Sequence, residues 1–149
     1  PERGEVKGRE QAMIEKEILQ ALQSKVIAAV ALSTVPTLPI AFVDVAFDPP
    51  NNGKYLELVH ITNNPADPTW NEEEYHRGML RLILHWPNNG GGAYTPLMLL
   101  ASISSQFRKG EKIAGLVTVL NKPKAMSKIA NGQENLYPAS VEYSVFTLA

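Results

Sequence analysis

Cysteine is absent from the 149-residue chain, and neither a long apolar run nor an excess of charge of one sign is present. Without cysteine there is no disulfide framework, no thiolate nucleophile and no cysteine-based zinc or iron–sulfur site. The longest apolar run, Val26–Leu32, is far shorter than the roughly 20 residues that a membrane-spanning helix needs. A net charge of −1 supplies no basic field for nucleic acid or an anionic membrane. We therefore expect neither a membrane nor a specific nucleic acid as partner.

The length suits one domain with a sizeable core. Residues 1–12 mix charges with glycines, and Val6 is their single large aliphatic residue. The apolar pattern begins after Met13, which makes Met13 the better candidate for a natural start. We expect residues 1–12 to be a disordered lead and residues 13–149 to be a single domain.

The first regular pattern after this lead is an apolar residue at every fourth position. This spacing predicts an amphipathic helix of about five turns. The pattern fades near Ser33 and Thr34, and Pro36 and Pro39 prevent the helix from continuing. The apolar stripe consists of Ile14, Ile18, Leu22, Val26 and Val30.

Three strands are predicted in the middle of the chain. Residues 40–47 are apolar and β-branched, and a turn rich in proline, asparagine and glycine follows at residues 48–53. Residues 54–62 then alternate, which favours a hairpin with a wide loop. Residues 75–86 end in Trp86-Pro87 and favour a strand of about ten residues.

The last third predicts a second helix and further strands. Thr95 and Pro96 fit an N-cap and a first helical position, and Gly110 fits the helix end. The expected stripe on this helix is Leu97, Leu100, Ile103 and Phe107, and the expected strands cover residues 113–120, 125–129 and 137–148. Short connections join most strands, so we expect an α+β fold with a mainly antiparallel sheet and two helices packed on one face.

The three histidines are the natural candidates for a metal site. His76 and His85 lie nine positions apart on one predicted strand, so they point to opposite faces, and His60 lies on another strand. No HExxH or HxH spacing is present. Histidines with satisfied ring nitrogens are the favoured interpretation, and we expect no metal and no cofactor.

Other candidate sites lack residues that the corresponding functional motif requires. The stretch 88–92 precedes a helix but has neither a P-loop lysine nor GxGxxG spacing. The serines at 102, 104 and 105 lack a GxSxG elbow. Lys122, Lys124 and Lys128 form a basic cluster without interleaved aromatics. No catalytic residue is predicted, and the chain is not expected to be an enzyme.

Charge is distributed unevenly along the chain. Residues 40–77 carry a net −5, and residues 78–149 carry +4. One interpretation is a set of solvated faces, and the other is a pair of complementary surfaces that meet when copies associate head to tail. The candidate subunit-interface residues are Glu72, Glu73, Glu74, Lys122, Lys124 and Lys128.

An ordered set of segments over residues 13–147 resembles the tail-terminator-like proteins of long-tailed bacteriophages, of the phage lambda type. The set begins with the first helix, which is followed by prolines, and continues with Ile40-Ala41-Phe42 running to Asp48-Pro49-Pro50 and with Lys54-Tyr55-Leu56-Glu57. Arg77-Gly78 then precedes the strand that ends at Trp86-Pro87, and a glycine-rich loop follows. The last two segments are the helix that ends at Phe107-Arg108-Lys109-Gly110 and the strand Pro138–Phe146.

This resemblance implies a structural virion protein without catalysis. Such proteins form a homo-oligomeric, hexameric ring that ends tail-tube polymerisation and presents the surface that joins the head. The implied partners are further copies of the chain, the tail tube protein and the head–tail connector protein. The implied location is the head-proximal end of the tail, with assembly in the host bacterial cytoplasm.

Three alternatives stay open at this point. The first is another head–tail joining or minor tail protein of a phage or prophage. The second is a small α+β ligand- or peptide-binding domain that adds a strand to an exposed sheet edge. The third is a metal-dependent enzyme built on the histidines.

Overall fold

The computed structural model describes the backbone of residues 2–62, 73–89 and 91–148, and the side chains of residues 13–62, 76–89 and 91–145. Within these ranges the chain forms two helices and a mixed sheet of eight strands. The helices are α1 (Glu2–Ala31) and α2 (Tyr94–Ser104). The strands are β1 (Ile40–Ala41), β2 (Tyr55–Thr62), β3 (Glu73–Pro87), β4 (Lys112–Ile113), β5 (Val117–Val119), β6 (Lys124–Ala125), β7 (Ile129–Asn131) and β8 (Glu134–Leu148).

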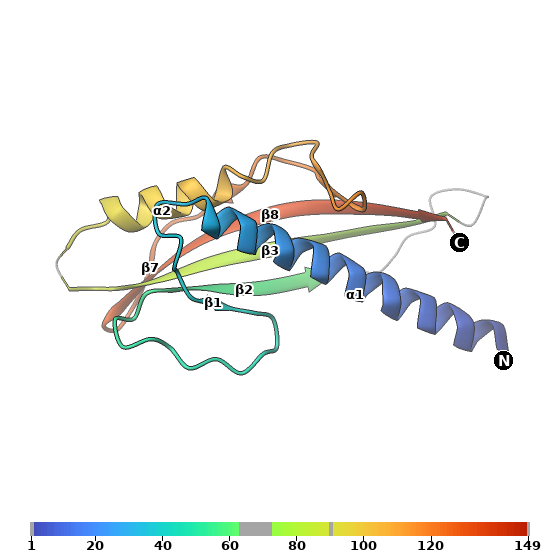
Figure 1. Cartoon of the computed structure of the whole chain (residues 1–149), viewed down its shortest axis with the longest axis horizontal. Coiled ribbons are helices and arrows are strands. Elements are labelled where there is room, and N and C mark those ends of the chain that lie inside the picture. Colours follow the sequence, from blue (N-terminus) through green and yellow to red (C-terminus); the bar gives the residue numbers. More distant parts are fainter. Residues whose placement is uncertain (1, 63–72, 90, 149) are drawn as a thin grey trace.

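The centre of the sheet is the long antiparallel pair of β3 and β8, whose 15 residue pairs run from Glu73–Leu148 to Pro87–Glu134. The strand order is β1-β2-β3-β8-β5-β4. Three short strands lie one after another along the outer side of β8, because β7, β6 and β5 pair with successive parts of it. The pair therefore spans the molecule, with β7 near one end and the C-terminus at the other (Figure 1).

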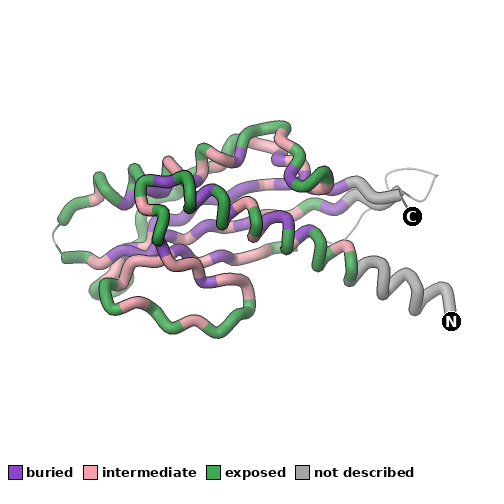
Figure 2. The backbone as a smooth tube through the Cα atoms, in the orientation of Figure 1, coloured by how far each residue is buried: buried purple, intermediate pink, exposed green. Residues whose placement is uncertain are grey.

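One face of the sheet supplies most of the core. The alternation predicted for β2 is confirmed, since Leu56 and Leu58 are buried and Tyr55, Glu57 and Val59 point to the other face. Both helices contribute to the same buried cluster as this face, and Figure 2 shows buried residues gathered in the strands and along α1 and α2. The sheet members of the cluster include Leu56, Leu58, Leu80, Leu82, Leu84, Tyr137, Ala139, Val141 and Tyr143.

The predicted hairpin between residues 40–47 and 54–62 is wrong. Only Ile40 and Ala41 form a strand, and they run parallel to Leu56 and Glu57. Asp44 has a φ of 56°, which an extended strand does not allow. The chain leaves the sheet after Ala41 and returns in the same direction. We call residues 42–54 the β1–β2 loop.

The helix boundaries also differ from the prediction. The backbone of residues 2–12 is helical where a disordered lead was expected, because α1 begins at Glu2. The expected Thr95 cap is wrong, since α2 begins at Tyr94 and its N-cap, Ala93, makes no side-chain cap bond. The stripe is shifted as well: Leu97 is 49% exposed, and Leu99 is fully buried.

The strand predicted over residues 113–120 is instead a tight hairpin of β4 and β5. Ala114 and Gly115 have φ values of 53° and 68°, so the backbone reverses between Ile113 and Leu116. Lys25 Nζ lies 2.9 Å from Glu111 Oε1 and joins α1 to the segment just before this hairpin.

Candidate functional site

The structure does not bring the two halves of the predicted interface together. Glu72 lies outside the described residues, and only the backbone of Glu73 and Glu74 is described, at the end of β3 opposite Leu148 and Thr147. The three predicted lysines, Lys122, Lys124 and Lys128, are all exposed beside β6 and β7.

The separation of these groups follows from the strand register. Lys124 pairs with Ser140, and Ser140 pairs with Arg81. Arg81 is eight positions along β3 from Glu73, which corresponds to roughly 26 Å at the rise of an extended strand. Within one chain, the lysines therefore lie well away from the backbone positions of Glu73 and Glu74.

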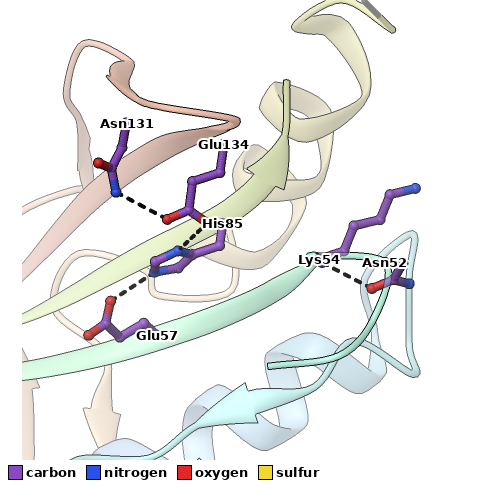
Figure 3. A network of polar contacts seen from close by, with 6 residues as sticks. All are labelled: Asn52, Lys54, Glu57, His85, Asn131 and Glu134. Carbon is purple, nitrogen blue, oxygen red and sulfur yellow. Dashed lines mark hydrogen bonds and ion pairs between the residues drawn. The ribbon is translucent and has the colours of Figure 1, made fainter. Parts of the chain in front are cut away.

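His85 lies at the centre of a polar network that crosses three strands (Figure 3). Its Nε2 is 2.8 Å from Glu57 Oε1 on β2, and its Nδ1 is 3.2 Å from Glu134 Oε2 on β8. Because carboxylates only accept, each of these hydrogen bonds requires an N–H on the ring. Glu134 also accepts from Asn131 Nδ2 at 3.2 Å. The network joins β2, β3 and β8 on the sheet face opposite Leu56 and Leu58.

Aromatic rings connect this network to the β1–β2 loop. Tyr55 stacks on His85 with ring centroids 4.1 Å apart, and Phe47 of the loop packs on Tyr55 at 5.0 Å. Lys54 Nζ lies 4.6 Å from the centroid of the Trp86 ring, a cation–π distance. Burial raises the pKa of the Tyr55 hydroxyl, and the nearby Glu134 and Glu57 carboxylates raise it further. The returning arm of the loop is thus fixed to the sheet.

A cavity of about 480 Å³ lies between the β1–β2 loop and the outer edge of β2. Phe42, Val43 and Phe47 line it from the loop, and Val59 and His60 line it from β2. Beyond Glu57, β2 has no strand partner on this side within the described residues. This edge of the sheet is acidic, because Asp44 and Asp48 are exposed on the loop and Glu57 lies beside them on β2.

A second hollow, of about 630 Å³, lies at the C-terminal end of α2, beyond the other edge of β8. We call it the α2 hollow. It is mainly apolar, with a basic rim. Its lining residues are Ala101, Ser104, Ser105, Phe107, Pro123 and the basic Arg108, Lys109 and Lys122. In the described part of the chain, none of these three cations forms an ion pair.

The partly buried His60 and the buried Tyr143 form a pair on the core face. Their Nε2 and Oη atoms are hydrogen-bonded across β3, and Gly78 lies between them. A Cβ at Gly78 would meet Tyr143 Oη at 2.4 Å, so a glycine is needed for the tyrosine ring to cross the strand. Burial lowers the pKa of His60, although Glu15 opposes the shift, and burial together with Glu15 raises the pKa of Tyr143 to about 12.

The other predicted candidates stay separate. His60 and His85 lie on opposite faces of the sheet, and the described residues contain no cluster of His, Asp or Glu that could hold a metal ion. The hydroxyls of Ser104 and Ser105 donate to backbone carbonyls one turn earlier in α2, at 3.4 and 2.9 Å. No described helix has the length and apolar character to cross a bilayer.

Sequence reasoning missed the two features that the fold presents at its edges, the β1–β2 loop and the α2 hollow. Residues 40–47 are apolar, β-branched or aromatic apart from Asp44 and therefore resembled a strand. For the hollow, the available signal was the basic run Arg108-Lys109 beside Phe107.

The fold is that of an α+β domain that offers surfaces at both edges of its sheet. The pattern of the family described as phage tail terminator protein matches residues 17–143, and the chain belongs to this family. It is accordingly a structural component of a phage tail and of the virion.

One solved structure shares the fold. A chain known only by a sequence identifier has a TM-score of 0.73 and 21% identity, over 91% of this chain and 97% of that one. A chain from the virion of a native gene transfer agent particle has a TM-score of 0.45 and 16% identity, over 80% and 84% of the two chains. No curated protein matches.

Proposed function

We propose that the protein caps the phage tail tube as a homo-oligomeric ring, as predicted from the resemblance, and that the ring is a hexamer. The ring ends tube polymerisation and presents the surface that joins the head. The observation that carries this proposal is the family match over residues 17–143. The role is structural, with no catalytic step and no cofactor.

The distribution of charge supports a ring. Asp44, Asp48 and Glu57 lie at the β1–β2 edge of the sheet. The opposite edge carries the exposed cations Arg108, Lys109, Lys112, Lys122, Lys124 and Lys128. Two acidic side chains near the basic edge already have partners in the same chain. Glu111 forms an ion pair with Lys25, and Glu142 accepts a hydrogen bond from Asn121 Nδ2 at 2.8 Å. The acidic edge of one copy attracts the basic edge of its neighbour. A repeated head-to-tail contact of this kind closes into a ring when the rotation between neighbouring copies permits.

Glu72, Glu73 and Glu74 are proposed to face Lys122, Lys124 and Lys128 of a neighbouring copy. The separation along the β3–β8 pair supports this, because the lysines lie far from the backbone of Glu73 and Glu74 in the same chain. Reversal of the three acids to lysine should weaken self-association about tenfold at low salt, with little change in monomer stability. Unchanged self-association in sedimentation equilibrium would exclude this triplet from the interface.

The flat ends of such a ring supply the remaining contacts. One end meets the tail tube protein and the other meets the head–tail connector protein, at the head-proximal end of the tail. Copies of the chain assemble with the tube in the host cytoplasm.

The solution mass tests the proposal directly. Light scattering over a hundredfold range of concentration, with and without the cognate tube protein, is expected to give a closed species of about six copies, visible as a ring in negative stain. A monomer at all concentrations, with no ring on tube ends, would overturn the proposed function.

A further inference from the structure

We propose that the β1–β2 loop of one copy inserts into the α2 hollow of the next copy, with Val45 as the apolar contact and Asp44 and Asp48 opposite Arg108 and Lys109. This inference rests on the proposed ring and names the two surfaces that meet in it.

The β1–β2 loop exposes one large hydrophobic side chain, that of Val45. Val45 is 60% exposed, although its neighbours Phe42 and Phe47 are turned inward and half-buried. The positive φ of Asp44 and the hydrogen bond from Val45 N–H to the Phe42 carbonyl, at 3.3 Å, form the turn that carries it. The Phe47–Tyr55 contact fixes the returning arm. A loop that is ordered before binding loses less conformational entropy in the complex.

The α2 hollow matches this loop in chemistry. Its lining is mainly apolar and includes Phe107 and Pro123, and the basic side chains of Arg108 and Lys109 also belong to it. A valine flanked by two exposed aspartates offers an apolar centre and two negative charges to such a site. Apolar burial at the centre and charge pairing at the rim are the usual division in protein interfaces.

The loop of the same chain cannot occupy the hollow. The loop lies outside β2, whereas the hollow lies beyond β8, and β3 separates these two strands. Three strand spacings, from β1 to β8, amount to about 14 Å. In Figure 1, helix α2 and the β1–β2 loop lie on opposite sides of the strands. The occupant is therefore the loop of a second copy, and the contact is head to tail.

The absence of cysteine permits a clean cross-linking test in the full chain. A Val45→Cys, Ser105→Cys double variant treated with a short bismaleimide should give a ladder of linked oligomers that ends at the ring size. A mixture of the two single variants should give heterodimers only. The matched control is an Ile61→Cys, Ser105→Cys double variant. Ile61 is 40% exposed and lies at the far end of the same sheet edge. This control should give at least about tenfold less cross-linked oligomer.

The outcomes separate this inference from the proposed function. Rings in light scattering without the 45–105 ladder would overturn the inference and leave the ring intact. A ladder without a closed ring would support the contact and overturn the ring. Monomers alone, with no ladder even on tube ends, would overturn both.

A charge exchange gives a second, independent measurement. The D44K/D48K variant and the R108E/K109E variant should each weaken self-association about tenfold, and the quadruple variant should recover most of the loss. Loss in both variants without recovery in the quadruple variant would overturn the pairing of these two surfaces.

Discussion

His60 and His85 lie on opposite faces of one sheet and contact different kinds of side chain. His60 lies on the core face and meets the neutral hydroxyl of Tyr143. His85 lies on the opposite face and meets the carboxylates of Glu57 and Glu134. The partner of each ring follows from strand register, which pairs Tyr143 with Gly78 and places Glu57 diagonally across from His85. The same residue type thus contacts a hydroxyl on one face of the sheet and links two carboxylates on the other.

The largest expected effect compares adjacent residues on the two faces. Leu82 is fully buried on the core face, so Leu82→Ala should lower the free energy of unfolding by about 3 kcal/mol through lost apolar contact and a residual cavity. Ile83→Ala, on the partly exposed face, should cost about 1 kcal/mol or less. Urea unfolding measures both, and equal losses would contradict the assignment of the two faces.

Gly78→Ala tests the crossing of Tyr143 over β3. The added Cβ would lie 2.4 Å from Tyr143 Oη and 2.8 Å from the Ile61 carbonyl oxygen, so either the ring or the strand must move. We expect a loss of about 2 kcal/mol. Gly91→Ala is the control, because its Cβ would approach no described atom closer than 3.1 Å and the residue is exposed. A neutral Gly78→Ala would show that the tyrosine ring does not need the space.

His85→Gln should have a smaller effect, about 1 kcal/mol. Glutamine keeps a donor for one carboxylate but not for both, and it loses the stack on Tyr55. Side-chain exposures of 42% for Glu57 and 32% for Glu134 allow water to replace part of what is lost. Thermal unfolding at neutral pH gives the value, with Glu57→Gln as the companion variant. A loss as large as that of Leu82→Ala would contradict this estimate.

The smallest effect is a pH dependence that arises from His60. Because burial lowers its pKa in the folded state, the unfolded chain binds the proton more readily below the ordinary pKa of about 6.5. The free energy of unfolding should therefore be unaffected by His60 above that pH and should fall as the pH drops below it. His60→Gln should flatten this part of the profile between pH 7.5 and 5.5. An identical slope in both proteins would assign the dependence to other groups.

Alternation predicted the β2 strand and its buried face, and left-handed backbone explains two strands that were wrongly predicted. Leu56 and Leu58 alternate with polar neighbours, so their strand and its buried face were predictable. Asp44 and Ala114 have positive φ without being glycine, and residue type alone does not indicate such positions. They turned one expected strand into a loop and another into a hairpin.

The candidate sites were harder to predict, because they depend on contacts between distant segments. The position of His85 between Glu57 and Glu134 requires the register of three strands. The α2 hollow requires α2 to end at Ser104, six residues earlier than expected. Neither the strand register nor the early end of α2 has a local signal in the chain, although the basic run beside Phe107 marks the segment that lines the hollow.

The central β3–β8 pair also has a consequence for how the protein folds. Its residue pairs join positions that are 47 apart in sequence at Pro87–Glu134 and 75 apart at Glu73–Leu148. Closing such long loops costs chain entropy before any contact compensates for it, so chains with distant strand pairings fold slowly. The loop that presents Val45 and the edge that carries the α2 hollow flank this pair on its two sides. A newly made chain therefore presents the two surfaces proposed for assembly together only after its slowest strand pairing has formed.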